Sequence, residues 1–166
     1  MFDSFAFLAW AIPIGLGATA FMDIAALVRK SLAGTPLPDY ALVGRWLAHM
    51  PRGRFRHSSI AAAAPIPGER LTGWTVHYLT GIAFAALLLV FFGPDWVHHP
   101  VPGPALAVGI VSVAAPFLLM QPGMGAGLAS RRSPSPNAAR LRSLVTHTIF
   151  GLGLYAAGWI THLLAR

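Results

Sequence analysis

The sequence predicts an all-α membrane protein with four transmembrane helices in a single domain, residues 1–166. Two features of its composition predict this class. Hydrophobic residues make up 55% of the chain and charged residues only 10%, whereas soluble domains carry about 25% charged residues. The apolar residues also gather in four stretches, each close to the ~20 residues that cross a ~30 Å hydrocarbon core. The alternative is a soluble helical bundle, whose helices would need polar outer faces that these stretches almost entirely lack.

The four apolar stretches are each predicted to form one membrane-spanning helix. Only the first contains a charged residue, Asp23. Gly occurs inside all of them and Pro inside the first and third, and membrane helices tolerate these residues better than soluble helices do. No basic residue precedes the first stretch, unlike a secretory signal peptide, so we expect it to be retained. The predicted spans are residues 5–28, 71–92, 104–122 and 144–164.

The first loop, residues 29–70, is long and is predicted to contain a short amphipathic helix. Its apolar residues recur at helical spacing from Tyr40 to Met50, and the pattern stops at Pro51. One apolar face on a short helix beside a membrane is typical of an interfacial helix. We therefore expect this helix to lie along the bilayer surface, with Trp46 at the depth of the headgroups.

The basic residues predict the topology. Eleven of the twelve Lys and Arg residues lie in the loops 29–70 and 129–142, and none lies in the loop 93–103. The positive-inside rule places the two basic loops in the cytoplasm and both termini on the opposite side, which is the periplasm of a Gram-negative cell. The net charge of +7 therefore follows from topology, and we expect no nucleic-acid partner.

Two groups of arginines in these loops are candidates for binding anionic lipid headgroups. A basic cluster beside a membrane attracts anionic lipid by about 1 kcal/mol per charge. The alternative is that these residues only determine topology. The candidates are Arg52, Arg54 and Arg56 in the first loop, and Arg131 and Arg132 in the third.

Spans two and four share a pattern that indicates an internal repeat. Each contains a histidine followed four residues later by a glycine, His77 with Gly81 and His147 with Gly151. This spacing places both residues on one helix face. The pattern suggests two helical hairpins related by an axis along the membrane normal, although chance similarity stays an alternative.

One polar side chain in each span is predicted to lie in the cytoplasmic half of the membrane. Counting about 1.5 Å per residue from the nearest basic residue gives depths of roughly 7–15 Å. Because a lipid-facing carboxylate is costly, we expect Asp23 to face the bundle interior and to contact His77 or His147, with Thr19 one turn earlier on the same face. The predicted intramembrane polar site is Thr19, Asp23, His77, Gln121 and His147.

The polar site permits three interpretations. It is a hydrogen-bonded cluster that fixes helix packing, a site for a proton, ion or small solute, or a haem or divalent-metal site. His77 and His147 would ligate haem iron, and Asp23, His77 and His147 would ligate a metal. The chain has no cysteine, which excludes thiolate chemistry and iron–sulfur clusters.

We expect a non-enzymatic membrane protein that senses, conducts or assembles. No nucleotide-binding, metalloprotease or serine-hydrolase motif is present in the sequence. The alternatives are a haem- or metal-binding protein and an accessory subunit of a larger membrane complex. The expected partners are the bilayer and its anionic headgroups, with a homo-oligomer or a larger complex left open.

Four strings distributed along most of the chain resemble a family of small bacterial inner-membrane proteins that is catalogued as a domain of unknown function. The resemblance implies a four-span protein of the inner membrane and supplies no established activity. The strings are Gly17-Ala-Thr19-Ala-Phe-Met22-Asp23, Arg52-Gly-Arg-Phe-Arg-His57 with Gly68-Glu69-Arg70, Gln121-Pro122-x-Met124-Gly125, and Arg140-Leu-Arg-Ser-Leu-x-x-His147.

Overall fold

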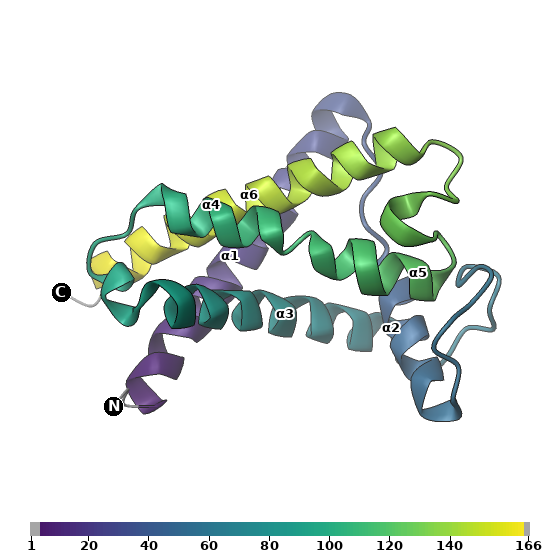
Figure 1. The fold of residues 1–166 in the computed structure, drawn as a ribbon, viewed down its shortest axis with the longest axis horizontal. Coiled ribbons are helices and arrows are strands. Elements are labelled where there is room, and N and C mark those ends of the chain that lie inside the picture. The colour runs from purple at the N-terminus through teal and green to yellow at the C-terminus, as the bar shows by residue number, and fades with distance from the viewer. Residues whose placement is uncertain (1–3, 165–166) are drawn as a thin grey trace. The chain divides into compact units, whose positions relative to one another are not determined.

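The computed structural model of the chain describes residues 4–164, and four of its helical segments are long and apolar enough to cross a membrane (Figure 1). This confirms the predicted all-α fold with four spans. The segments are Phe7–Ala33, Glu69–Phe92, Pro102–Met124 and Pro136–Leu164.

The first and last spans belong to helices that are longer than their apolar stretches. Helical hydrogen bonding does not stop where hydropathy does, so both helices continue through basic segments. The α-helices are α1 (Ser4–Ala33), α2 (Tyr40–His49), α3 (Glu69–Phe92), α4 (Pro102–Val111), α5 (Gln121–Met124) and α6 (Pro136–Leu164). Short helical turns are η1 (Met50–Arg52), η2 (Pro94–Val97), the π-helical η3 (Pro116–Met120) and η4 (Leu128–Ser130).

The third span is interrupted, which the sequence analysis did not predict. Helix α4 ends at Val111, a turn follows at Ser112, and the chain then passes through the π-helix η3 into α5. Pro116 begins η3. Proline has no amide hydrogen and its ring collides with the carbonyl four residues earlier, so it interrupts α-helical bonding. Short π-helical turns often occur at functional sites.

The chain divides into two compact units. Helices α3 and α6 each contribute residues to both units without a break. Unit 1 comprises Met1–Leu37, Tyr78–Ser112 and Val145–Arg166, and unit 2 comprises Pro38–His77 and Val113–Leu144.

Unit 1 has an apolar core in which small residues bring helices together. A Cβ on Gly109 of α4 would overlap the backbone of Gly151 of α6, and one on Gly15 of α1 would overlap the backbone of Ile82 of α3. Small residues at such crossings are typical of membrane bundles. The core comprises Ala11, Ile14, Ala18, Ala85, Leu88, Leu89, Trp96, Val97, Ala105, Phe150, Leu154 and Ala157.

In unit 2, α2 packs against the beginning of α3. A Cβ on Gly44 would overlap the carbonyl of Glu69, and one on Gly73 would overlap the carbonyl of Tyr40. The helix predicted from Tyr40 to Met50 is confirmed as α2, which ends at His49. The Trp46 indole packs against Gly123 and donates a 2.9 Å hydrogen bond to the carbonyl of Phe55. The placement of α2 along the bilayer stays a prediction.

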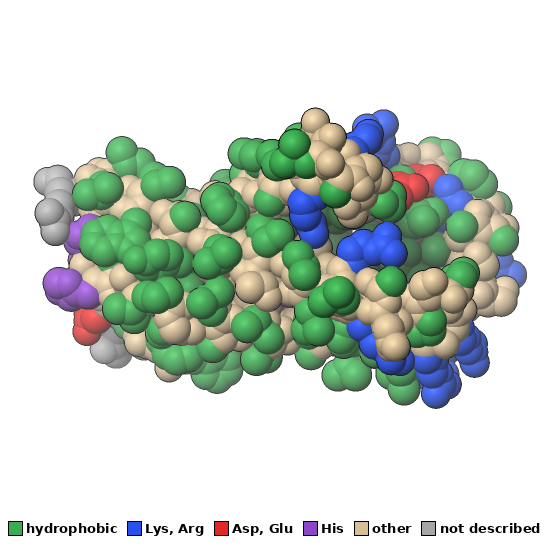
Figure 2. Space-filling view, turned by 90° about the horizontal axis from the view of Figure 1, so that it is seen from above, with side chains coloured by type: hydrophobic (Ala, Val, Ile, Leu, Met, Phe, Trp, Pro, Cys, Tyr) green, Lys and Arg blue, Asp and Glu red, His purple; other side chains and the backbone are tan. Residues whose placement is uncertain are grey.

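The surface of the candidate spans is mostly apolar, as expected for helices in contact with lipid. Only 17–39% of the most hydrophobic window of each candidate span is buried within the protein. Large apolar side chains point outward along the spans, with Val90 60% and Leu119 68% exposed. Figure 2 shows broad hydrophobic surface, with Lys and Arg side chains gathered together. An exposed apolar surface this extensive is typical of helices that cross a membrane.

Candidate functional site

The carboxylate inside the first span has a hydroxyl partner. Asp23 of α1 accepts a hydrogen bond from the Tyr78 hydroxyl of α3, at 3.2 Å from its Oδ2 atom. Both residues belong to unit 1. The sequence analysis did not select Tyr78, although it directly follows the predicted site residue His77.

The second contact lies where the third span is interrupted. Ser112 Oγ lies 2.6 Å from Nδ1 of His147, and Ser112 also donates to the carbonyl of Gly109 at 2.6 Å. A hydroxyl has one proton to donate. Because that proton goes to Gly109, the serine oxygen accepts from Nδ1–H of His147. This fixes the imidazole as the tautomer whose Nε2 accepts a proton.

A third contact joins α1 to α6 one residue before His147. Arg29 Nη2 donates to Oγ1 of Thr146 at 3.2 Å. Nε of Arg29 is buried and has no hydrogen-bond partner within residues 4–164. The three contacts therefore pair α1 with α3, α4 with α6, and α1 with α6, all within unit 1. We call Asp23, Tyr78, Ser112 and His147 the unit 1 polar set.

The other predicted polar residues have different surroundings. Thr19 is 1% exposed and donates to the carbonyl of Gly15 in its own helix at 2.8 Å. His77 stacks on Tyr40 in unit 2, with ring centroids 4.0 Å apart. Gln121 Nε2 donates to Ser143 Oγ at 3.5 Å, also in unit 2. Contact of Asp23 with His77 or His147 stays a prediction.

The part of the chain that the structure describes contains no cluster of side chains arranged as metal ligands. Within it, no three His, Asp or Glu side chains are grouped so as to hold a metal ion. The proposed set of Asp23, His77 and His147 is therefore not assembled as a three-ligand cluster there.

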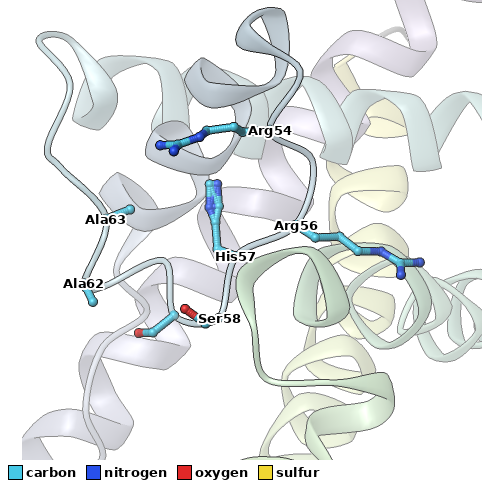
Figure 3. A pocket seen from close by; sticks show the side chains of 7 residues that line it. Arg54, Arg56, His57, Ser58, Ala62 and Ala63 are labelled. Carbon is cyan, nitrogen blue, oxygen red and sulfur yellow. The ribbon is translucent and has the colours of Figure 1, made fainter.

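A polar cavity in unit 2 lies at the predicted basic cluster of the first loop (Figure 3). Its volume is about 300 Å³. Arg52 lies outside the cavity and donates to the carbonyl of Ala48 at 3.4 Å. Arg131 and Arg132 follow η4, also in unit 2. The lining residues are Arg54, Arg56, His57, Ser58, Ser59, Ala62 and Ala63.

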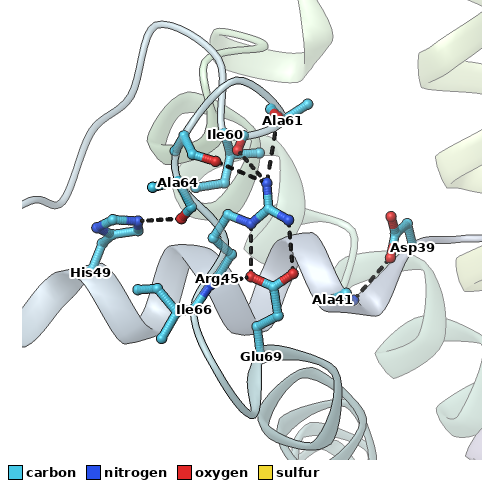
Figure 4. A network of polar contacts seen from close by, with 10 residues as sticks. Asp39, Ala41, Arg45, His49, Ile60, Ala61, Ala64, Ile66 and Glu69 are labelled. Atoms are coloured by element: carbon cyan, nitrogen blue, oxygen red, sulfur yellow. Dashed lines mark hydrogen bonds and ion pairs between the residues drawn. The ribbon is translucent and has the colours of Figure 1, made fainter.

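An ion pair anchors the loop that forms this cavity (Figure 4). Arg45 Nε and Nη2 donate to the two carboxylate oxygens of Glu69 at 2.8 and 2.7 Å. Arg45 Nη1 donates to the carbonyl of Ala63 at 3.0 Å, and the amide of Ile66 donates to Glu69 at 2.9 Å. The hydrogen bond to Glu69 raises the pKa of Arg45 above its usual value. The sequence pattern did not predict this ion pair.

Comparison with known proteins identifies the family and no activity. Residues 12–161 match the family described as "Protein of unknown function (DUF2938)". The chain belongs to this family. No curated protein and no solved structure matches it. The match includes the unit 1 polar set and the cavity of unit 2, so both sites lie within the DUF2938 domain.

Proposed function

We propose that this DUF2938 protein is a non-enzymatic protein of the bacterial inner membrane that binds and moves a proton through the unit 1 polar set. We propose the orientation that the positive-inside rule gives, with the basic loops in the cytoplasm and both termini in the periplasm. The observation that carries the proposal is the Ser112–His147 hydrogen bond at the interruption of the third span.

The geometry of His147 supports this function. The hydrogen bond to Ser112 Oγ holds Nδ1 of His147 as a donor and leaves Nε2 as the atom that takes up a proton. Interrupted helices recur in transporters beside their ion and substrate sites. Histidines and carboxylates within spans are the side chains from which proton relays are built. Asp23 with its phenol partner supplies a second group that exchanges protons.

Proton flux into liposomes tests the proposal. The purified protein is reconstituted with a pH-sensitive dye inside, and a potassium diffusion potential drives proton entry. We expect flux from the wild type and its loss in His147→Gln, because an amide takes up no proton. His99→Gln is the matched control, since His99 is exposed and outside the polar set.

Two results contradict the proposal. One is the absence of flux from wild-type protein that is shown to be folded and inserted. The other is equal flux from wild type and a folded His147→Gln variant. Asp23→Asn adds a second arm, in which the hydrogen bond from Tyr78 is kept and the ionisable group is removed.

A further inference from the structure

We propose that the cavity of unit 2 is a binding site for a phosphate group, supplied either by a lipid headgroup or by a soluble phosphorylated molecule. The cavity brings a guanidinium, an imidazole and two hydroxyl groups together from Arg54, His57, Ser58 and Ser59. Arg pairs with phosphate through a planar fork of donors, and hydroxyls donate to the remaining oxygens. Nothing in this argument depends on the proton function proposed for unit 1.

The orientation of the side chains distinguishes the two cavity arginines. In Figure 3 the Arg54 side chain extends over His57 on the side of Ala62 and Ala63. The Arg56 side chain extends in the opposite direction, away from these residues. Arg54 is therefore the expected phosphate ligand, and Arg56 contributes only the general positive charge of the loop.

The size of the cavity limits the ligand. A volume of about 300 Å³ is at the lower end of the roughly 300–1,000 Å³ found for small-molecule sites. It accommodates a headgroup or a small phosphorylated compound. The acyl chains of a lipid would have to remain outside it.

The loop around the cavity is held by backbone hydrogen bonds, so the site is formed before ligand binds. The amide of His57 donates to the carbonyl of Gly123 at 2.8 Å, and the amide of Ile60 donates to the carbonyl of Met124 at 3.0 Å. The turn at Gly125 passes directly against the carbonyl of Ser58, where a Cβ would overlap it. A preformed site binds more tightly because less conformational freedom is lost.

The charges around the cavity favour an anion. Unit 2 contains nine arginines and two carboxylates. Both carboxylates have partners: Glu69 binds Arg45, and Asp39 caps α2 by accepting from the amide of Ala41 at 3.0 Å. Within residues 4–164, the Arg54 guanidinium has no hydrogen bond or ion pair. Its charge is therefore available to a ligand.

Two buried imidazole nitrogens also support the binding of an anion in the cavity. Nε2 of His57 and Nδ1 of His49 are buried and have no hydrogen-bond partner in the described part of the chain. The two rings lie 5.0 Å apart. A buried polar atom without a partner is costly. An anion in the cavity would give His57 a partner for a protonated nitrogen.

Binding measurements on the full-length protein in nanodiscs of zwitterionic lipid test the proposal. One arm titrates inorganic phosphate, and the other titrates dioctanoyl phosphatidic acid, by isothermal calorimetry. We expect at least one probe to bind. Arg54→Gln is expected to weaken that binding by roughly tenfold or more, because a hydrogen bond to a charged group is lost. Arg70→Gln is the matched control, since Arg70 is an exposed arginine of unit 2 outside the cavity lining, and it is expected to change binding by less than about threefold.

A second variant fills the cavity without changing charge. Ala62→Trp is expected to abolish binding, since Ala62 lines the cavity and is exposed. Binding of the lipid probe alone identifies a headgroup site, and binding of inorganic phosphate identifies a site for soluble phosphate. The proposal is overturned if neither probe binds, if Arg54→Gln and Arg70→Gln weaken binding equally, or if Ala62→Trp binds like wild type.

Discussion

At the scale of single residues, Asp23 and His147 inside the spans each have a neutral hydroxyl partner. Ser112 holds His147, and Tyr78 donates to Asp23. Each partner sets what the ionisable group can do: Ser112 fixes a tautomer, and Tyr78 stabilises a carboxylate. Removing the hydroxyls one at a time therefore separates their roles.

Ser112→Ala is expected to let the His147 imidazole populate both of its neutral tautomers. Without the serine oxygen, Nδ1–H loses the acceptor that lies 2.6 Å away, and the imidazole redistributes between its two neutral forms. Nitrogen-15 NMR of labelled histidine measures the change directly. Thr161→Val is a suitable control, because its hydroxyl bonds to Ala157 of its own helix. An unchanged His147 spectrum in Ser112→Ala would contradict the tautomer assignment.

Asp23 and Tyr78 are expected to show coupled stabilities. A double-mutant cycle with Asp23→Leu and Tyr78→Phe isolates their hydrogen bond from other contacts of either residue. The expected coupling is about 0.6 kcal/mol and no more than about 1.7 kcal/mol, which are the average and the maximum for hydrogen bonds between membrane helices. Asp23→Asn should retain most of the stability, since an amide oxygen still accepts from Tyr78. Denaturant unfolding in micelles measures these values, and additive single substitutions would exclude the bond.

His57 is expected to make unit 2 less stable at acidic pH. Burial, His49 and Arg54 lower the pKa of His57 below its usual value of 6.5. The unfolded chain therefore binds more protons than the folded one as pH falls below about 6.5, so folding stability falls as pH drops toward the lowered pKa. Hydrogen exchange of the loop amides between about pH 8 and about pH 5 measures the trend. His57→Gln should flatten it, and an unaltered slope would contradict the assignment.

At the scale of elements, the helices of unit 1 meet through small residues and the third span is broken. Pro13 and Pro116 both lie within predicted spans, yet α1 continues through Pro13. One difference is visible at Ser112. In an uninterrupted helix the Gly109 carbonyl accepts from the amide of residue 113. Here it accepts the Ser112 hydroxyl, and residue 113 belongs to the turn that interrupts the span.

Gly109→Ala is expected to destabilise the protein by about 1–3 kcal/mol, because its methyl group would overlap the backbone of Gly151. Gly103→Ala is the matched control in the same helix. No atom lies within 4 Å of a Cβ placed there, so the substitution should be neutral or slightly stabilising. Thermal unfolding in detergent compares the two variants. Equal effects would show that α4 and α6 do not meet at Gly109.

At the scale of the whole molecule, charge is divided unequally between the two units. Unit 1 contains three basic and three acidic residues, whereas unit 2 contains nine arginines and two acids. The entire net charge of +7 thus belongs to unit 2. In the orientation that we propose from the positive-inside rule, unit 2 contains the cytoplasmic loops.

Reporter fusions test this topology. A reporter joined after Ser133 is expected to be active in the cytoplasm, and one joined after Pro100 is expected to be active in the periplasm, because the loop 93–103 contains no Lys or Arg. Alkaline phosphatase and green fluorescent protein provide opposite readouts at each position. A periplasmic Ser133 would invert the proposed orientation.

The sequence was sufficient for the spans, the amphipathic helix and the arginine-rich loops, because each rests on a local pattern of hydropathy or charge. It was not sufficient for Ser112, Tyr78 or the Arg45–Glu69 pair. Their partners lie 24 to 55 residues away along the chain, and no local pattern encodes such a distance. Ser112 also looks unremarkable in sequence, since its importance depends on where the helix breaks.

Helices α3 and α6 continue without a break across the boundaries between the units, whereas the third span is interrupted. This difference limits where residues can be inserted into or deleted from the chain. One residue inserted between Tyr78 and Ile82, which both lie in the unit 1 part of α3, would turn one relative to the other by about 100°. The hydrogen bond from Tyr78 to Asp23 and the close approach of Ile82 to Gly15 could then not both be kept. An insertion just after Ser112 would be absorbed where helical bonding has already stopped. Length differences among DUF2938 proteins should therefore occur at that break and in the loops, while α3 and α6 keep a fixed count of residues.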